Sequence, residues 1–412
     1  MTNTINDRDL PLPADIAENL ENAVAIRRAI HNEPEIGLDT VKTAEKAVAE
    51  LRRIGCDEIV GNLGGAGVVG LIRGRGLPEG ARRPRIGLRG DTDALPLVEA
   101  TGCAYTSGFE GVMHACGHDG HTAGILLAGA ALAARRDRLM GDVLLILQPG
   151  EEGFAGARRM IEDGMLERFP LDEIYGAHGA ADLPVGTFGF TKGFMQASAD
   201  HIFITVKGKG GHGARPHTVV DPIVAAGTLI VALQTVVSRS INPMHPAVVS
   251  LGSIQGGDPV GVSVVPETVK LTGTTRCASP EDQDVLERRI GEICAGVGAA
   301  TGAEIMVEYR RVYPPLLNHE AQTDAAVAIA REFFGDEAVC DNMPGAMGAE
   351  DFSFFLQKVP GCYLRAGLRD AQHTSNLHAP TFDYNDRTLG PTAALLAEIA
   401  EKRLEALAKG AC

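Results

Sequence analysis

The sequence predicts an α/β protein, in which a mostly parallel sheet flanked by helices forms one domain that carries an inserted α+β domain. Apolar strands alternate with helices in residues 1–195 and 311–412, a pattern typical of a parallel sheet covered on both faces. Residues 196–310 run in the order β-α-β-β-α-β, which predicts a self-contained ferredoxin-like unit. The 412 residues also exceed the size of one ordinary core. We therefore predict a discontinuous first domain interrupted by a second.

The predicted elements of the first domain alternate in type along the chain. Residues 14–31 have the apolar spacing of a helix and end at the turn NEPE. Residues 121–139 predict an alanine-rich helix, and residues 141–153 predict a buried strand that runs into a Gly/Pro turn. The other elements are helices near 40–54 and 155–164, strands near 67–74 and 85–91, and, after the insertion, a helix at 324–335, a strand at 362–367 and a helix at 388–409.

The insertion opens with an alternating strand at 198–211. Its long helix at 279–302 has a Ser/Pro start and a glycine stop. Its remaining elements are a helix at 221–239 and strands at 247–257, 264–276 and 303–310.

Charge and composition argue against several classes of protein. The formal net charge of −15 disfavours a surface for nucleic acid or for an acidic membrane. The sequence has no run of 18 apolar residues, so we predict no membrane span. The N-terminal stretch lacks the basic start and apolar core of a signal peptide. The eight cysteines have no framework spacing, so we expect them to be reduced. We expect a soluble protein of the cytoplasm.

Five polar clusters interrupt the apolar pattern, all at predicted strand ends or loops, where α/β proteins build their sites. They are LRGDTDALP (88–96), HACGHDGH (114–121), QPGEEGFAGA (148–157), IYGAHGA (174–180) and SNLHAPTFDYND (375–386).

The cluster HACGHDGH is dense in groups that can bind a metal. Cys116 and His118 are two residues apart, so that a thiolate and an imidazole can converge on one divalent transition metal. The other interpretation is a polar turn before the following helix. We expect His114, Asp119 and His121 to have only such supporting or helix-capping roles.

Two pairs of acids add carboxylates. Asp91 and Asp93, two residues apart at a strand end, can point the same way, although an ordinary Asp-rich turn has the same appearance. Glu151 and Glu152 are adjacent, so their side chains diverge: one can bind a metal while the other faces a water as general base. An acidic helix start is the alternative.

His178 and His378 would each be structural if considered alone. Together, the five clusters supply one thiolate, three imidazoles and at least two carboxylates. This surplus over the four ligands of a single ion suits two metals that share a bridging group.

The chain resembles the two-metal amidohydrolase family of aminoacylases and carboxypeptidases, and within it the branch of hippurate hydrolases and indole-acetyl-amino-acid hydrolases. The resemblance covers nearly the whole chain in the family's order. The matching strings are HNEPEIG (31–37), RGDTDALP (89–96), HACGHDGHTA (114–123), QPGEEGFAGA (148–157), GAHGA (176–180), GKGGHGARPHTVVDPI (208–223), NP (242–243), GTTR (273–276), MGAEDFSFF (347–355) and LHAPTFDYND (377–386).

The resemblance implies roles for the clustered residues. Cys116 corresponds to a bridging thiolate, which would hold one metal with Glu152 and His378 and a second metal with His118 and His178. Glu151 corresponds to the general base. Asp93 would orient a ligand. The two ions would be divalent zinc, manganese, nickel or cobalt.

The resemblance also implies that residues 196–310 form a lid and dimerisation domain, through which the chain would form a homodimer or homotetramer. The remainder, residues 1–195 and 311–412, would be the catalytic domain. His212 corresponds to a histidine that reaches a neighbouring subunit's site and holds the developing oxyanion. Arg276 corresponds to an arginine that grips a substrate carboxylate. Ser263 stands where the family usually has a substrate-binding asparagine, a departure that bears on substrate choice.

The function implied is metal-dependent hydrolysis of the amide bond of N-acyl or N-aroyl amino acids, by a metal-activated water with Glu151 as base. The substrate would be a small molecule, such as a hippurate-like, acetyl- or indole-acetyl-amino acid. A dipeptidase or carboxypeptidase with the same chemistry is the alternative. Two other classes stay open: an enzyme with Cys116 as nucleophile, and a metal-binding scaffold without activity, against which the intact Glu151–Glu152 pair argues.

Overall fold

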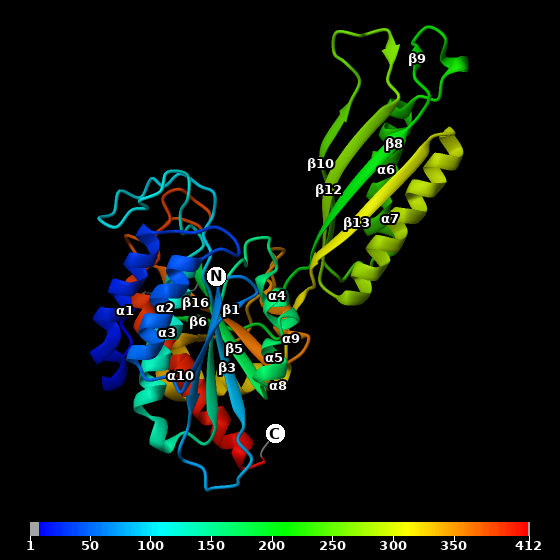
Figure 1. The fold of residues 1–412 in the computed structure, drawn as a ribbon. Coiled ribbons are helices and arrows are strands. Elements are labelled where there is room, and N and C mark those ends of the chain that lie inside the picture. Colours follow the sequence, from blue (N-terminus) through cyan, green and yellow to red (C-terminus); the bar gives the residue numbers. More distant parts are fainter. Residues whose placement is uncertain (1–7, 411–412) are drawn as a thin grey trace. The chain divides into compact units, whose positions relative to one another are not determined.

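The computed structural model describes residues 8–410, which divide into two compact units (Figure 1). The first unit comprises the described residues up to Gly193, together with residues 317–344 and 354–410. The second unit comprises residues 194–316 and the short segment 345–353. This segment lay outside the predicted insertion. It joins the second unit because the Ala197 amide donates hydrogen bonds to the carbonyls of Ala346 and Gly348, at 3.1 and 2.8 Å.

The first unit is built on an eight-stranded sheet of order β1-β2-β4-β3-β5-β16-β6-β15. Its centre, from β4 to β16, is parallel, and antiparallel strands β1, β2 and β6 extend it on both sides, so the prediction of a mostly parallel sheet is confirmed. Its strands are β1 (Glu58–Leu63), β2 (Gly67–Arg73), β3 (Arg85–Asp91), β4 (Asp142–Gln148), β5 (Glu173–Pro184), β6 (Phe188–Gly189), β15 (Val339–Cys340) and β16 (Gly361–Arg369).

Helices cover this sheet. They are α1 (Ala14–Asn32), α2 (Val41–Arg53), α3 (His118–Ala134), α4 (Gly156–Glu162), α5 (Met165–Arg168), α8 (Glu320–Phe334) and α10 (Leu389–Ala408), with 3-10 turns η1 (Arg136–Arg138), η3 (Asp336–Ala338) and η4 (Asp386–Thr388). The central helix α3 starts at His118, not at the predicted residue 121, because Gly117 adopts a left-handed conformation with φ 89° and turns the chain into the helix.

The second unit has a four-stranded antiparallel sheet of order β10-β12-β8-β13. Its chain order β8-α6-β10-β12-α7-β13 is the predicted β-α-β-β-α-β pattern. The elements are β8 (Ala199–Lys207), β9 (Gly211–His212), η2 (Pro216–Thr218), α6 (Pro222–Ser240), β10 (Ala247–Gly256), β11 (Val264–Val265), β12 (Thr268–Cys277), α7 (Pro280–Thr301) and β13 (Glu304–Tyr313). Where the chain passes between units lie β7 (Gly193–Gln196), β14 (Leu316–Asn318) and α9 (Phe352–Leu356).

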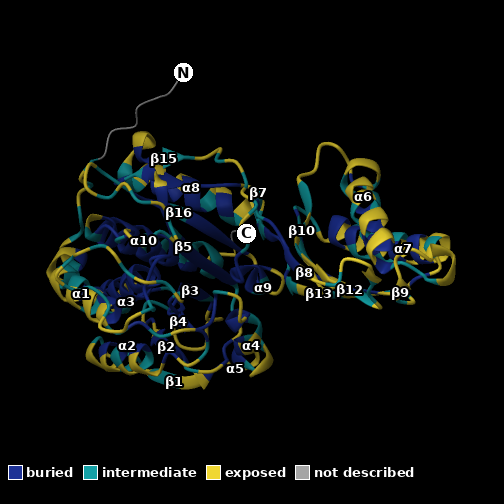
Figure 2. Cartoon of the chain, turned by 90° about the horizontal axis from the view of Figure 1, so that it is seen from above, coloured by how far each residue is buried: buried dark blue, intermediate teal, exposed yellow. Residues whose placement is uncertain are grey.

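Helix α6 is the one described helix long and apolar enough to cross a membrane. Its inner face, which includes Leu229, Leu233 and Val236, is buried in the core of the second unit together with β8 and α7 residues. Its outer face is exposed, as the yellow colour in Figure 2 shows. The helix is therefore a packed element of this unit.

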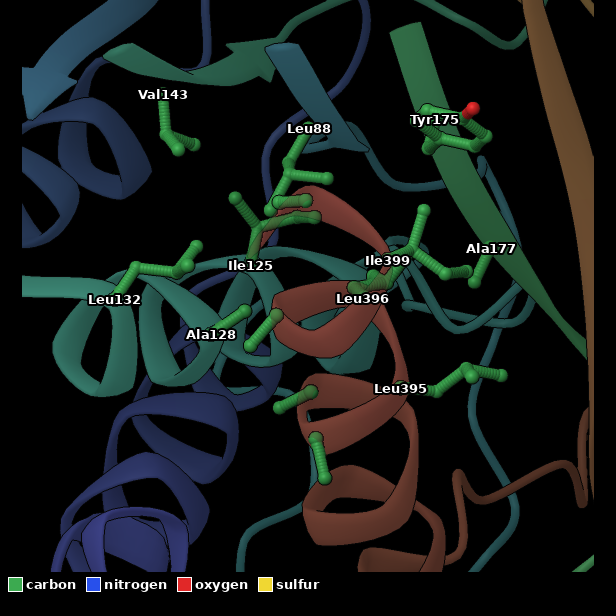
Figure 3. Packing of buried hydrophobic residues seen from close by; sticks show 14 of the residues in the cluster. Leu88, Ile125, Ala128, Leu132, Val143, Tyr175, Ala177, Leu395, Leu396 and Ile399 are labelled. Carbon is green, nitrogen blue, oxygen red and sulfur yellow. The ribbon is translucent and has the colours of Figure 1, made fainter. Parts of the chain in front are cut away.

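Helix α3 holds the central place in the first unit's core. Its residues from His118 to Leu132 are all buried. In Figure 3, Ile125, Ala128 and Leu132 of α3 lie among apolar side chains of β3, β4 and α10. Because α3 begins at His118 and Cys116 lies two residues before it, this packing fixes the position of both candidate ligands.

Two glycines on α3 allow a matched test of this packing. A Cβ at Gly120 would lie 2.5 Å from the buried ring of Tyr384, whereas a Cβ at Gly124 would meet nothing within 4 Å. We expect Gly120→Ala to lower the free energy of unfolding by about 1–3 kcal/mol through overpacking. Gly124→Ala should raise it by up to about 1 kcal/mol through helix propensity. Denaturant unfolding of both variants checks this, and equal effects would contradict the packing described.

Candidate metal centre

The candidate ligands come from five separate segments of the first unit. Asp91 ends β3, Glu151 and Glu152 follow β4, and His178 lies on β5. Cys116 and His118 lie at the start of α3, and His378 lies in the loop after β16. Because β3, β4 and β5 are parallel neighbours, Asp91, Glu151, Glu152 and His178 lie toward one edge of the sheet, where α/β proteins bind ligands.

Cys116 lies between two imidazoles. Its Sγ is 3.4 Å from Nε2 of His178 and 3.3 Å from Nε2 of His378. The donor atoms of Cys116, His118 and His178 all lie within 4.8 Å of one another, and so do those of Cys116, Glu152 and His378. The structure thus brings together the two predicted ligand triplets, and one thiol belongs to both.

The hydrogen bonds of His178 leave one of its nitrogens available. Nδ1 lies 2.8 Å from the carbonyl of Gly179 and must donate its proton there. Nε2, which faces Cys116, then carries a lone pair, as a metal ligand requires. Burial lowers the pKa of His178 to about 3, so the imidazole is neutral.

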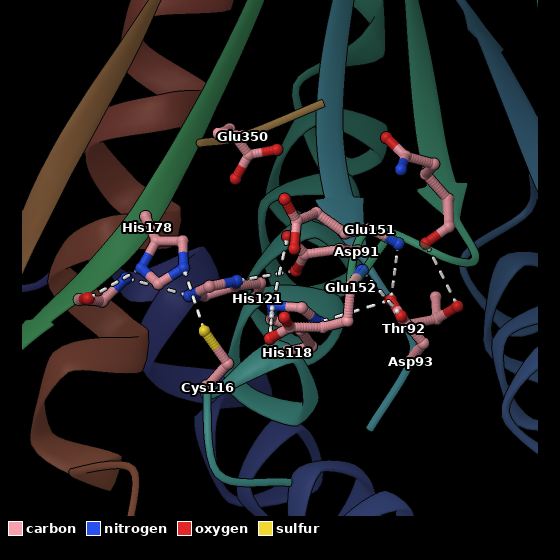
Figure 4. A network of polar contacts seen from close by, with 12 residues as sticks. Asp91, Thr92, Asp93, Cys116, His118, His121, Glu151, Glu152, His178 and Glu350 are labelled. Atoms are coloured by element: carbon pink, nitrogen blue, oxygen red, sulfur yellow. Dashed lines mark hydrogen bonds and ion pairs between the residues drawn. The ribbon is translucent and has the colours of Figure 1, made fainter. Parts of the chain in front are cut away.

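His121 has no nitrogen left for a metal. Its Nε2 accepts the Gly179 amide at 2.9 Å, and its Nδ1 lies 2.7 Å from Oδ1 of Asp91. Oδ2 of Asp91 accepts a hydrogen bond from Arg89 at 2.8 Å. The Asp91–His121 pair therefore supports Gly179, the neighbour of His178. Figure 4 shows Asp91, His121 and His178.

Asp93 shapes the acidic turn. Its two carboxylate oxygens accept the backbone amides of Glu151 and Glu152, at 2.9 and 3.0 Å (Figure 4). Oδ1 also lies 3.4 Å from Nδ1 of His118. One carboxylate thus fixes the Glu151–Glu152 turn and lies beside the His118 imidazole, the ligand candidate that the resemblance would have it orient.

Glu151 and Glu152 present carboxylates to the same cluster. Oxygen atoms of both lie within 4.8 Å of a ring nitrogen of His118. Oε1 of Glu152 is 3.3 Å from Nε2 of His378 and 4.0 Å from Nε2 of His118. Glu151 is buried, with 7% of its surface exposed.

The charges of this buried cluster fit a divalent metal. Within residues 8–410, both ring nitrogens of His118 and Oε1 of Glu152 are buried without a hydrogen-bond partner. Burial opposes ionisation, yet the Asp91 carboxylate raises the pKa of His118 well above its usual value. A divalent ion can take the place of the protons that offset these carboxylates. Thiolate, imidazole and carboxylate form the mixed donor set that zinc and similar metals accept.

The remaining predicted residues belong to the second unit. His212 is exposed on β9, where it pairs with Val264 of β11. Ser263 is its neighbour, because the Ser263 carbonyl accepts the Gly213 amide at 2.8 Å. Arg276 is half-buried on β12 and donates to the carbonyl of Thr275 at 2.9 Å.

Sequence reasoning missed two buried basic side chains of α1 that contact the residue next to His118. Arg27 and His31 of α1 are fully buried, and both contact Asp119, the residue after His118. Hydrogen bonds to Asp119 and Glu99 outweigh burial and raise the pKa of His31 to about 10. Both ring nitrogens of His31 face carboxylates, an arrangement that favours its protonated form. The only signal in the sequence was the place of His31 in the string HNEPEIG.

Comparisons with known proteins find similar chains that match nearly the whole sequence. The model of peptidase family M20/M25/M40 matches residues 87–402. The chain is 38% identical to the hippurate hydrolase of Campylobacter jejuni, over 92% of this chain and 96% of that protein. It is 36% identical to N-acetyl-L-cysteine deacetylase of Bacillus subtilis, over 95% and 91%. A Bacillus subtilis crystal structure described as a dinuclear metal-binding peptidase of the M20 family superposes with a TM-score of 0.81 at 32% identity, over 94% of this chain and 99% of that one.

The shared thiol predicts an asymmetric effect of two substitutions. Cys116→Ala removes a donor from both triplets, so we expect it to weaken the binding of both ions. His178→Ala removes a donor from one triplet and should weaken the binding of one ion. For both variants we expect the loss of metal affinity to exceed the roughly 10- to 100-fold loss that is typical of residues that only support a ligand. Metal titration of the metal-free protein measures this, with Cys56→Ala as the control for loss of a thiol. Two ions bound normally by Cys116→Ala would contradict the shared ligand.

Proposed function

The chain belongs to peptidase family M20/M25/M40, and from that premise we propose that it is a metal-dependent amidohydrolase that cleaves N-acyl or N-aroyl amino acids into a carboxylic acid and an amino acid. Relatives named hippurate hydrolase and N-acetyl-L-cysteine deacetylase, each more than 35% identical over most of the chain, support this substrate class. The observation that carries the proposal is the thiol of Cys116, shared by two donor triplets beside the buried Glu151.

Two divalent ions of zinc, manganese, nickel or cobalt, held by Cys116 with His118 and His178 and by Cys116 with Glu152 and His378, would polarise the amide carbonyl and acidify a water. Glu151 is placed beside both triplets, since its carboxylate lies within 4.8 Å of donor atoms of His118 and Glu152. In the proposal it accepts the proton of the attacking water and passes it to the leaving amine nitrogen. Asp93 holds the backbone of Glu151 in place for this transfer.

The second unit supplies the rest of the proposed machinery. His212 would donate a hydrogen bond to the developing oxyanion of a neighbouring subunit's substrate. Arg276 would bind the substrate carboxylate with its fork of donors, and Ser263 would contact the amino-acid part. The unit would therefore act as lid and as the contact of a homodimer or homotetramer. Exposed Val224 and Val231 on α6 offer apolar surface for such an assembly.

The proposal places the chain in the cytoplasm. A thiolate that binds metals must be kept reduced, and the cytoplasm supplies the reducing conditions for this.

The structure gives a reason to prefer a metal ligand over a nucleophile at Cys116. Burial raises the pKa of the Cys116 thiol, whereas nucleophilic cysteines have a lowered pKa and are partly exposed. Three imidazoles and the Glu152 carboxylate surround the sulfur, which is more than a thiol–imidazole pair needs.

A chelator separates these two chemistries. We expect a strong chelator to abolish hydrolysis of hippurate and N-acetyl amino acids, and added zinc or manganese to restore it, because the carbonyl and the water depend on the ions. Assays of hippurate, N-acetyl amino acids and dipeptides are run in parallel. Full activity after chelation would contradict the metal mechanism. Turnover of dipeptides alone would favour a dipeptidase.

A substitution of the proposed base tests its role. Glu151→Gln keeps the size and the backbone hydrogen bond to Asp93 but removes the proton acceptor. We expect kcat to fall about 10²- to 10⁴-fold while both ions still bind. The matched control is Glu162→Gln on α4, whose side chain is 65% exposed and which should retain full activity. A Glu151→Gln variant with an unchanged kcat would disprove the assignment.

A further inference from the structure

Two ligand-bearing segments of the proposed metal centre have little regular structure to hold them together. Cys116 and His118 lie at the start of α3, whereas His378 lies in the irregular stretch between β16 and η4. His378 has φ 62°, a left-handed conformation that is unfavourable for a residue with a side chain. Its backbone amide donates to the carbonyl of Ala115 at 2.8 Å. The surrounding structure must hold this conformation in place.

Helix α1 reaches the first of these segments. Arg27 and His31 are four residues apart and therefore lie on one face of the helix, and both are fully buried. Oδ2 of Asp119, the residue after His118, lies 2.9 Å from Nδ1 of His31 and 3.2 Å from a terminal nitrogen of Arg27.

The same arginine reaches the second segment. The terminal nitrogen that contacts Asp119 also lies 3.0 Å from Oδ1 of Asp383, and Nε lies 2.8 Å from Oδ1 of Asp386. Tyr105 donates to Oδ2 of Asp383 at 2.7 Å and stacks under the Arg27 guanidinium at 4.6 Å. One buried guanidinium thus joins the His118 segment to the segment that carries His378.

The two cations of this group, Arg27 and His31, face four carboxylates and offset part of their negative charge. Both ring nitrogens of His31 face carboxylates, Asp119 on one side and Glu99 at 3.3 Å on the other. Arg27 faces three carboxylates. Removal of either cation would leave buried carboxylates without compensation, which is unfavourable enough to displace the segments that carry them.

We propose that Arg27 and His31 are positioning residues. They hold the Cys116–His118 segment and the His378 segment close enough for both to bind the proposed pair of metal ions. They act through Asp119 and Asp383 and touch no substrate. The inference rests on the proposed metal-dependent function and adds residues that control its metal affinity.

The test is a metal titration of the full-length, metal-free protein with zinc or manganese. Supporting residues of this kind change metal affinity by roughly 10- to 100-fold. We expect that loss in Arg27→Gln and in Asp383→Asn, with folded far-ultraviolet spectra and with activity restored in part by excess metal. A purely structural role would change thermal stability and leave metal affinity as it was.

Arg28→Gln is the matched control. Arg28 is the next residue of α1 and also contacts Asp386, at 2.7 Å, but its side chain is 48% exposed. We expect its metal affinity to stay within about twofold of the parent, because exposed ion pairs contribute little. Should Arg27→Gln fail to fold, Asp383→Asn decides, since Asp383 is 20% exposed and tolerates the change more easily.

The outcomes separate the two proposals. If the parent protein binds two ions and the variants bind them with the same affinity, the positioning role is overturned and the proposed function remains. A parent that binds no ion overturns the proposed function itself. Weakened binding in both Arg27→Gln and Asp383→Asn, but not in Arg28→Gln, supports the inference.

Discussion

The buried thiol of Cys116, between the imidazoles of His178 and His378, is the constraint on which the rest of the site depends. A sulfur in this position can serve two ions only if each imidazole presents a lone pair and a carboxylate balances the charge. The hydrogen bond from His178 to Gly179 meets the first condition for His178, and the proximity of Glu152 meets the second. The surrounding polar network holds the Cys116 sulfur and the imidazole and carboxylate atoms beside it in place.

Close packing around α3 holds the candidate ligands at its start in position. The helix is buried along its first four turns, and its glycines allow Tyr384 and the sheet to approach its backbone. Asp93 fixes the turn after β4, and Arg27 joins α1 to the start of α3 and to the loop after β16. Strands, helix and loops thus each hold a candidate ligand in place. Preorganisation of this kind is what metal-assisted hydrolysis requires from a protein.

Much of this could be predicted from the sequence, and the remainder depends on tertiary contacts. Apolar periodicity predicted the parallel sheet and the element order of the second unit, because both rest on local patterns. The short strands β6 and β15 and the joining of residues 345–353 to the second unit were missed, since two-residue strands and single backbone contacts leave no periodicity. The spacing of residue types predicted Cys116 and His118 as candidate ligands, and only the family resemblance assigned Glu152 as a ligand and Glu151 as the base. The parts played by His121, Arg27 and His31 arise from hydrogen bonds between residues far apart in the chain.

The central claim is that one thiolate bridges two ions. The most direct measurement is anomalous X-ray diffraction from crystals of the zinc-loaded protein, recorded at the zinc absorption edge. The account predicts two anomalous peaks, each about 2.3 Å from Sγ of Cys116, one beside His118 and His178 and the other beside Glu152 and His378. A single peak, or two peaks that do not share the Cys116 sulfur, would contradict it.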